Sequence, residues 1–258
     1  MVRVVPLGSG SSGNATLVEF GARRLLVDAG LSARELAARL EGVGVAPRQL
    51  TAILLSHEHH DHARGLERFA VKHGVPVFTA PETLAALNLS PRHLGAWHPF
   101  EPGVAFDAYG VKVDPFTVPH DAVNPVGFVL EAEGVRVGIV TDLGHATTLV
   151  VERLRGCHVL IVEANHDDGM LVRGPYPWAL KQRIGGRLGH LSNEEAATLL
   201  AATAGDDCQA VILAHLSESN NTVALARQAV ASSLAAAGRT RYAMRVAESR
   251  APTPAVEI

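Results

Sequence analysis

Histidines are concentrated in one short segment of this chain. Four of the 13 lie between His57 and His62, in the order His-Glu-His-His-Asp-His, directly after the apolar run Ala52–Ser56. Imidazole and carboxylate groups at this density are suited to zinc, manganese or iron. A solvated polar loop with a helix-capping aspartate is the alternative interpretation, and it accounts for a lone histidine better than for such a cluster. Because the segment follows a buried strand, its loop can turn these side chains onto one spot.

More potential metal ligands follow other apolar segments. They are His120 after Val113–Pro119, Asp142 after Val135–Thr141, and His215 after Ala210–Ala214. Each side chain stands just past a predicted strand, as the first cluster does. Three such coincidences are improbable, so we expect these loops to meet at one site.

Apolar segments and amphipathic segments alternate along the chain. The predicted strands are Val2–Leu7, Ala15–Phe20, Arg24–Asp28, Ala52–Ser56, Val75–Thr79, Val104–Tyr109, Val111–Val118, Gly127–Glu131, Val135–Val140, Val159–Glu163, Ala210–Ala214 and Tyr242–Glu248. The predicted helices are Ser32–Leu40, Ala63–His73, Pro81–Leu87, Thr147–Arg155, Tyr176–Arg183, Asn193–Ala204 and Asn221–Ala237. This order predicts an α/β fold of two packed β-sheets flanked by helices, in one domain over residues 1–258 with a loose tail at 250–258. Ser32 and Glu35 are expected to form a capping box.

The composition of the chain restricts the cellular location and the binding partners of the protein. The longest apolar runs are far shorter than the roughly 20 residues of a membrane span, and the N-terminal segment lacks the features of a secretory signal. Cys157 and Cys208 are too few for a disulfide framework. We therefore expect a cytoplasmic protein without a membrane partner; nothing in the sequence indicates its oligomeric state. The net charge of −3 excludes a generally basic nucleic-acid-binding surface.

A glycine-rich segment near the start of the chain matches the pattern of a dinucleotide-binding motif. Gly8–Gly13 fits the pattern G-x-G-x-x-G, but a β-prone segment, Ala15–Phe20, follows it where a helix is required. A tight turn is the simplest interpretation. The alternative is a turn whose N–H groups and Asn14 amide face an anionic ligand.

The combination of these motifs resembles the metallo-β-lactamase superfamily of metallo-hydrolases. Asp28, the His57–His62 cluster, His120, Asp142 and His215 match its five motifs in order. The resemblance implies an αβ/βα sandwich with two divalent ions, zinc or manganese with iron also possible, and a hydroxide held between them that attacks the substrate. The implied ligands are His57, His59 and His120 for the first ion, Asp61, His62 and His215 for the second, and Asp142 for both. Asp28 would support the histidine loop.

Two further residues indicate the branch of the superfamily. Glu163 and His190 occupy places where phosphodiesterases similar to ribonuclease Z carry a glutamate and a histidine that deliver a proton to the leaving oxygen. Asp61, Glu163 and His190 are therefore the candidate catalytic residues. In the alternative interpretation, His190 only packs beside a helix N-terminus.

Several longer strings look like the bacterial YycJ (WalJ) group, which is associated with 5′–3′ exonuclease action on DNA. They are Leu7–Asn14, Gly30–Ser32, Gly174–Pro177, Gly189–Asn193 and His215–Asn221. This resemblance implies a nucleic-acid substrate, with DNA favoured, because two dications can supply the local positive charge that the net charge hides. The alternatives are a phosphodiesterase acting on a small, cyclic or nucleotide-like substrate, and a metal-binding regulatory module without turnover.

The remaining candidates are weaker. Ser12, Asn14, His166 and Asn220 are predicted to support the site or the substrate. Tyr176, Lys181, Arg183 and Arg187 could line a phosphate path, as could Arg239, Arg241 and Arg245, although charged runs more often form a solvated face. His145 could support a ligand loop. Trp97 and Trp178 could stack on a base, but packing is the favoured interpretation for both.

Overall fold

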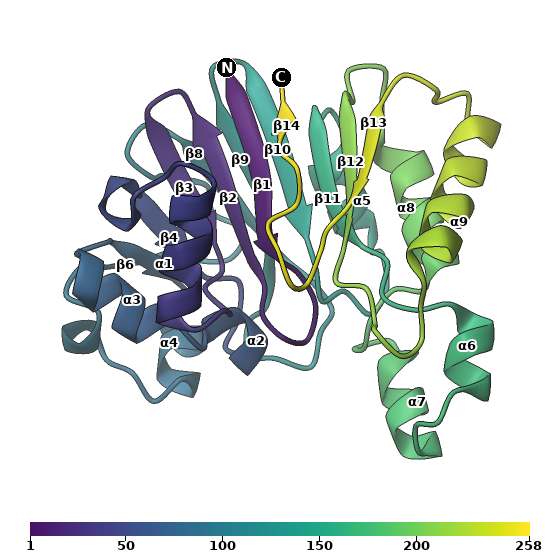
Figure 1. The fold of residues 1–258 in the computed structure, drawn as a ribbon, viewed down its shortest axis with the longest axis horizontal. Coiled ribbons are helices and arrows are strands. Elements are labelled where there is room, and N and C mark those ends of the chain that lie inside the picture. The colour runs from purple at the N-terminus through teal and green to yellow at the C-terminus, as the bar shows by residue number, and fades with distance from the viewer.

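The computed structural model describes residues 1–258 and contains two seven-stranded β-sheets packed face to face (Figure 1). In spatial order, the first sheet consists of β14 (Val256–Glu257), β1 (Val2–Gly8), β2 (Ala15–Phe20), β3 (Arg23–Val27), β4 (Ala52–Leu54), β5 (Val77–Thr79) and β6 (Trp97–Pro99). The second consists of β13 (Ala243–Val246), β12 (Ala210–Ala214), β11 (Val159–Glu163), β10 (Val135–Val140), β9 (Val126–Ala132), β8 (Lys112–Thr117) and β7 (Phe106–Asp107).

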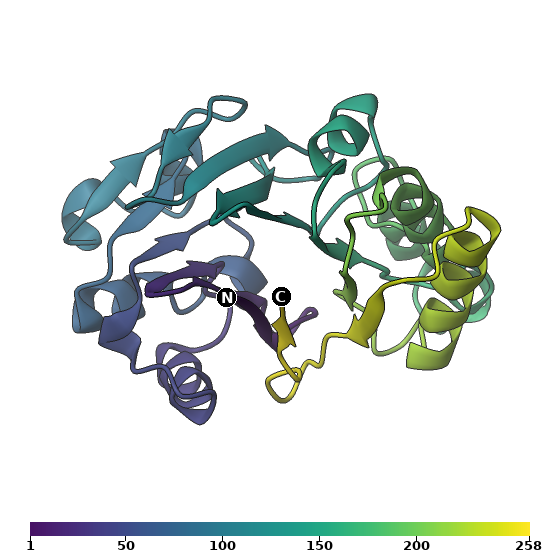
Figure 2. The ribbon, with the colours of Figure 1, turned by 90° about the horizontal axis from the view of Figure 1, so that it is seen from above.

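Helices cover the outer faces of both sheets, which gives four layers (Figure 2). The helices are α1 (Ala33–Gly42), α2 (His60–Ala63), α3 (Leu66–His73), α4 (Pro81–Ala86), α5 (Thr148–Leu154), α6 (Asp168–Arg173), α7 (Trp178–Ile184), α8 (Asn193–Thr203) and α9 (Val223–Ala236). Three buried apolar clusters lie between these layers. One lies between the sheets, and each of the others joins one sheet to its own helices. The predicted fold class is confirmed.

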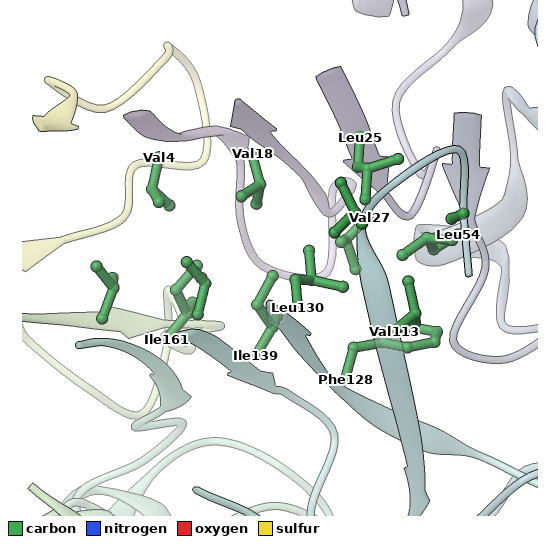
Figure 3. Close-up of a cluster of buried hydrophobic side chains, with 14 of the residues drawn as sticks. Val4, Val18, Leu25, Val27, Leu54, Val113, Phe128, Leu130, Ile139 and Ile161 are labelled. Carbon is green, nitrogen blue, oxygen red and sulfur yellow. The ribbon is translucent and has the colours of Figure 1, made fainter. Parts of the chain in front are cut away.

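The central cluster explains why the two sheets stay together. Val18, Leu25 and Leu54 of the first sheet point toward Phe128 and Ile161 of the second (Figure 3). The strands that carry these residues read as nearly continuous apolar runs because both of their faces are covered. Burial of each such side chain stabilises the fold by about 1.5–3 kcal/mol.

Strand direction decides where the loops go. In each sheet, part of the strands form antiparallel hairpins, while β3–β6 and β10–β13 run parallel. Parallel strands bring their carboxyl ends to the same edge, and ligands bind at that edge in open α/β sheets. The loops after β3, β4, β8, β10, β11 and β12 therefore gather at one end of the sandwich.

Several local predictions need correction. Ser32 does accept a hydrogen bond from the Glu35 N–H at 3.2 Å, but the Glu35 carboxylate pairs with Arg39, so only half of the capping box forms. The helix predicted at Ala63–His73 breaks before Leu66 into α2 and α3. Trp97 lies outside every predicted strand but belongs to β6, and α6 was not predicted at all.

The two cysteines are free and buried. Burial raises the pKa of Cys157 to about 12 and that of Cys208 to about 11. Both thiols therefore stay protonated near neutral pH, which makes them poor nucleophiles. None of the helices is both long enough and apolar enough to cross a membrane.

The C-terminal tail is not loose, which corrects the prediction for residues 250–258. Val256 and Glu257 form β14 beside β1, and backbone hydrogen bonds of 2.8 and 3.0 Å join Val2 to Ile258. Val256 is only 6% exposed and belongs to the central cluster. The segment covers an edge of β1 whose polar groups would otherwise be unpaired. Its two prolines and its short strand concealed this role in the sequence.

Removal of residues 252–258 should lower the free energy of unfolding by about 2–4 kcal/mol, because it exposes the central cluster and unpairs β1. Urea titration followed by circular dichroism measures this change. The variant Glu257→Gln, at an exposed position of the same strand, should stay within about 0.5 kcal/mol of the wild type. An unchanged unfolding midpoint after the truncation would mean that the tail contributes nothing.

Candidate metal centre and active site

The predicted ligands converge at the end of the sandwich where the parallel strands terminate. The structure places three imidazoles together, with the nitrogens of His57, His59 and His120 all within 4.8 Å of one another. His57 and His59 come from the loop after β4, and His120 comes from the loop after β8 in the other sheet. The first group of predicted ligands is thus assembled across both sheets.

A second group lies beside the first. The side chains of Asp61, His62 and His215 also have their ligand atoms within 4.8 Å of one another. Asp61 Oδ2 is 3.4 Å from His215 Nε2 and 3.7 Å from His62 Nε2. Again both sheets contribute, because His215 follows β12.

Asp142 connects the two groups. Its Oδ2 lies 2.9 Å from His62 Nε2, while its Oδ1 lies 3.7 Å from both His120 Nε2 and His215 Nε2. This carboxylate follows β10 and is 2% exposed. It faces members of both groups, as a bridging ligand requires.

The donor atoms suit divalent cations. His57 Nε2 is buried without a hydrogen-bond partner in the chain. Unpartnered buried polar atoms are costly unless something binds them. Five imidazoles and two carboxylates match the ligand preferences of zinc, manganese and iron. These residues therefore fit a metal centre.

Asp28 orients the histidine loop. Its Oδ1 accepts the Ser56 N–H at 2.8 Å, and its Oδ2 lies 3.0 Å from Ser56 Oγ and 2.7 Å from His62 Nδ1. A proton held on Nδ1 by this carboxylate leaves the Nε2 lone pair of His62 directed into the site. Candidate ligands such as His59, Asp61 and Asp142 line a cavity, which we call the active-site cavity. Asp28 itself does not line it. Its contacts with Ser56 and His62 are suited to supporting the histidine loop.

The glycine-rich turn after β1 also serves the site. The Asn14 side-chain amide lies 3.2 Å from Asp61 Oδ2 and 2.9 Å from His62 Nε2, and its own oxygen accepts the Gly10 N–H. The amide therefore holds a candidate ligand in place. Its neighbour Ser12, predicted to contribute, is exposed, and Ser11 lines the cavity instead.

Glu163 and His190 form a pair beside Asp142. The Glu163 carboxylate is fully buried and accepts three backbone N–H groups, from Asp142, Leu143 and Leu191, at 2.8–3.0 Å. His190 Nδ1 lies 3.1 Å from Glu163 Oε2. The ring of His190 lines the cavity, whereas Glu163 lies behind it. The carboxylate therefore orients the imidazole toward the cavity.

Electrostatic coupling within this pair is strong. Burial alone would raise the pKa of Glu163, but the charge and hydrogen bond of His190 outweigh that effect and lower it to about 2. Burial likewise opposes the charged form of His190, yet the Glu163 carboxylate raises the pKa of this imidazole above its usual value. The pair thus favours a carboxylate beside an imidazolium.

Three of these residues have an unusual backbone conformation. Asp28, Asp142 and His215 adopt positive φ values of 63°, 59° and 54°. This left-handed region is uncommon for residues other than glycine, and Asn, Asp and His tolerate it best. In each case the chain turns sharply just after a strand, which directs the side chain to the site.

Other predicted residues lie nearby without reaching the cavity. His166 and Asn220 are buried, and neither lines it. The Asn220 carbonyl accepts the Asp167 N–H, which anchors the start of α6. His145 contacts Arg187. The exposed side chain of Trp178 contradicts the packing interpretation.

The sequence interpretation missed several contributors. The Asn165 amide donates to the His215 carbonyl at 2.9 Å, and Ser9 Oγ accepts the His215 N–H at 2.7 Å. Asp121 lies beside His120, with Oδ1 3.4 Å from its Nε2. Burial alone would raise the pKa of Asp121, but a hydrogen bond from Arg183 lowers it. The position of Asp121 directly after a candidate ligand was the only signal in the sequence.

The chain is similar to known proteins. The profile of the β-lactamase superfamily domain matches residues 23–216. The chain belongs to the metallo-β-lactamase superfamily. It is accordingly a hydrolytic enzyme, as the sequence predicted.

The similar curated proteins include two bacterial enzymes. The chain is 36% identical to the exodeoxyribonuclease WalJ of Streptococcus pneumoniae over 236 residues, which cover 90% of this chain and 87% of that protein. It is 35% identical to the exodeoxyribonuclease YycJ of Bacillus anthracis over 230 residues, 87% of this chain and 86% of that one. Among solved structures, the metallo-β-lactamase fold protein YhfI of Bacillus subtilis covers 100% of both chains, with a TM-score of 0.78 and 18% identity.

The close approach of two loops provides a test of the site's construction. A Cβ atom on Gly30 would lie 1.6 Å from the Asp61 carbonyl oxygen, so Gly30→Ala must displace the loop that carries Asp61 and His62. We expect a loss of about 3 kcal/mol or more in stability together with reduced metal content. Thermal unfolding and elemental analysis measure these effects.

Gly42→Ala is the matched control. A Cβ at this position meets no atom within 4 Å, and alanine is more favourable than glycine in a helix. The substitution at the end of α1 should therefore raise the stability by about 0.5–1 kcal/mol. A Gly30→Ala protein with normal stability and metal content would contradict the described approach of the loops.

Proposed function

We propose that this enzyme is a phosphodiester hydrolase that uses two divalent cations and degrades DNA from an end in the 5′–3′ direction. The assembly of seven candidate ligands, six of them around Asp142, beside the Glu163–His190 pair carries this proposal. The identity to exodeoxyribonucleases over most of the chain supports the nuclease activity and the choice of DNA. We place this activity in the cytoplasm, since two free thiols suit a reducing compartment.

The candidate ligands divide into two sets. His57, His59 and His120 would hold one ion, Asp61, His62 and His215 the other, and Asp142 both. When bound, the ions would supply Lewis-acid stabilisation of the phosphate charge and a nucleophile derived from water. Asp28 and Asn14 keep the second set oriented through His62 and Asp61.

His190 is the proposed proton donor to the leaving oxygen. Its ring lines the cavity, and the carboxylate of Glu163 holds its Nδ1 side. A donor of this kind neutralises the alkoxide that separates from phosphorus and accelerates the reaction by about 10²–10⁴-fold. Glu163 keeps its own charge because three backbone N–H groups stabilise it.

Removal of one candidate ligand should abolish nuclease activity. His59→Ala should lose one of two bound ions and reduce the release of nucleotides from end-labelled duplex DNA by more than about 100-fold. His60→Ala, at the exposed neighbouring position, should behave as the wild type. Chelation should abolish activity, and added manganese or zinc should restore it. Elemental analysis and gel electrophoresis provide the measurements.

The position of the label on the DNA tests the direction of digestion. A 5′–3′ exonuclease releases a 5′ label at once as a mononucleotide and a 3′ label only late. Equal activity of His59→Ala and the wild type would refute the metal-dependent mechanism. Hydrolysis of bis-p-nitrophenyl phosphate without any degradation of DNA or RNA would instead indicate a small phosphodiester substrate, and tight metal binding without hydrolysis of any ester would indicate a regulatory module.

The role of His190 predicts a dependence on the leaving group. His190→Ala should lower kcat for DNA by about 10²–10⁴-fold, because the departing sugar alkoxide needs a proton. The same variant should lose much less activity on bis-p-nitrophenyl phosphate, since p-nitrophenolate departs without protonation. Equal losses on both substrates, measured in steady-state assays at normal metal content, would argue against proton donation.

A further inference from the structure

One wall of the active-site cavity differs chemically from the rest. The cavity has a volume of about 300 Å³, and the hydrophobic residues that line it are Tyr176, Leu180 and Ile184. All three belong to one segment, residues 168–187, which we call the arm. The arm carries α6 and α7 and projects beyond the ends of the sheets (Figure 1). The other lining residues are polar or glycine, and they include the candidate ligands His59, Asp61, His120, Asp142 and His215.

The arm also differs from the rest of the chain in charge. Residues 168–187 contain four Lys or Arg residues and one acidic residue, Asp168, in a chain of net charge −3. Arg183 is the basic residue of this stretch that lines the cavity. A positive charge next to a flat apolar surface complements a nucleotide, which joins an anionic phosphate to a flat base.

The guanidinium of Arg183 is paired with Asp121 beside the candidate metal centre. Its Nε and Nη2 both lie 2.7 Å from Asp121 Oδ2. The Arg183 side chain is 65% exposed, and an exposed pair of this kind contributes only about 0–1 kcal/mol. Exchange of Asp121 for a phosphate oxygen therefore costs little, and guanidinium N–H groups are good donors to phosphate.

Tyr176 supplies the flat surface. It is half-buried at the cavity, and its hydroxyl makes no hydrogen bond within the chain. No hydrogen bond of the hydroxyl within the chain therefore accounts for a tyrosine at this position. Trp178, two residues later, is 65% exposed and does not line the cavity. Side chains two positions apart on a helix point in nearly opposite directions, so Trp178 and Leu180 occupy different faces of α7.

We propose that the wall formed by Tyr176, Leu180, Arg183 and Ile184 is a nucleotide-binding subsite, in which Tyr176 stacks on the base and Arg183 binds a phosphate. This inference rests on the proposed nuclease function and adds the group that the enzyme recognises. The cavity volume is at the lower end of the range for ligand sites. This volume is sufficient for one nucleotide unit.

A pair of ligands tests the subsite without any cleavage. Isothermal titration of the metal-loaded protein compares deoxyadenosine 5′-monophosphate with 2-deoxyribose 5-phosphate, which lacks the base. We expect the nucleotide to bind about 5- to 100-fold more tightly to the wild type. Tyr176→Ala should remove most of this preference, and Tyr176→Phe should retain it because the ring remains. Arg183→Ala should weaken both ligands by about tenfold or more.

Trp178→Ala is the control on the same helix and should change neither affinity. The inference is overturned if the wild type binds both ligands equally, if Tyr176→Phe fails to preserve the preference, or if Trp178→Ala removes it. A parallel digestion of an oligodeoxynucleotide separates the two proposals. A nucleotide preference without digestion refutes only the nuclease function, whereas digestion without a preference refutes only the subsite.

Discussion

The buried carboxylate of Glu163 holds together the half of the site that the second sheet provides. It accepts the N–H groups of Asp142, Leu143 and Leu191 and contacts the ring of His190. A buried charge is tolerated only when such donors surround it. The loop after β10, the end of β11 and the segment before α8 are therefore fixed relative to one another. The position of the central carboxylate, Asp142, follows from this arrangement.

Asp28 has the equivalent task in the first sheet. Like Glu163, it lies at the end of a strand, accepts a backbone N–H of the neighbouring loop and orients an imidazole. Neither carboxylate lines the cavity. The two halves then meet where Asp142 approaches His62 at 2.9 Å. Each sheet thus orients its own ligands through a buried carboxylate, and the contact between the two sheets completes the centre.

Much of this organisation could be predicted from the sequence, because apolar runs identify buried strands and the residues after them identify the edge where loops meet. His120, Asp142 and His215 became candidate ligands on that basis, and the structure brings them together. The pairing of Asp121 with Arg183 could not be predicted, since it joins residues that local patterns do not relate. The tail was misjudged for the same reason: its partner β1 lies at the other end of the chain.

The left-handed turns at the metal centre also restrict how such an enzyme can evolve. Asp28, Asp142 and His215 occupy a backbone region that few residue types tolerate. Aspartate and histidine are among the tolerated types, and they are also good ligands for hard and borderline cations. A change to glutamate or cysteine would alter the ligand chemistry and strain the turn together. Two of the seven candidate ligands, Asp142 and His215, are therefore difficult to exchange by a single substitution, whereas the other five have no such backbone constraint.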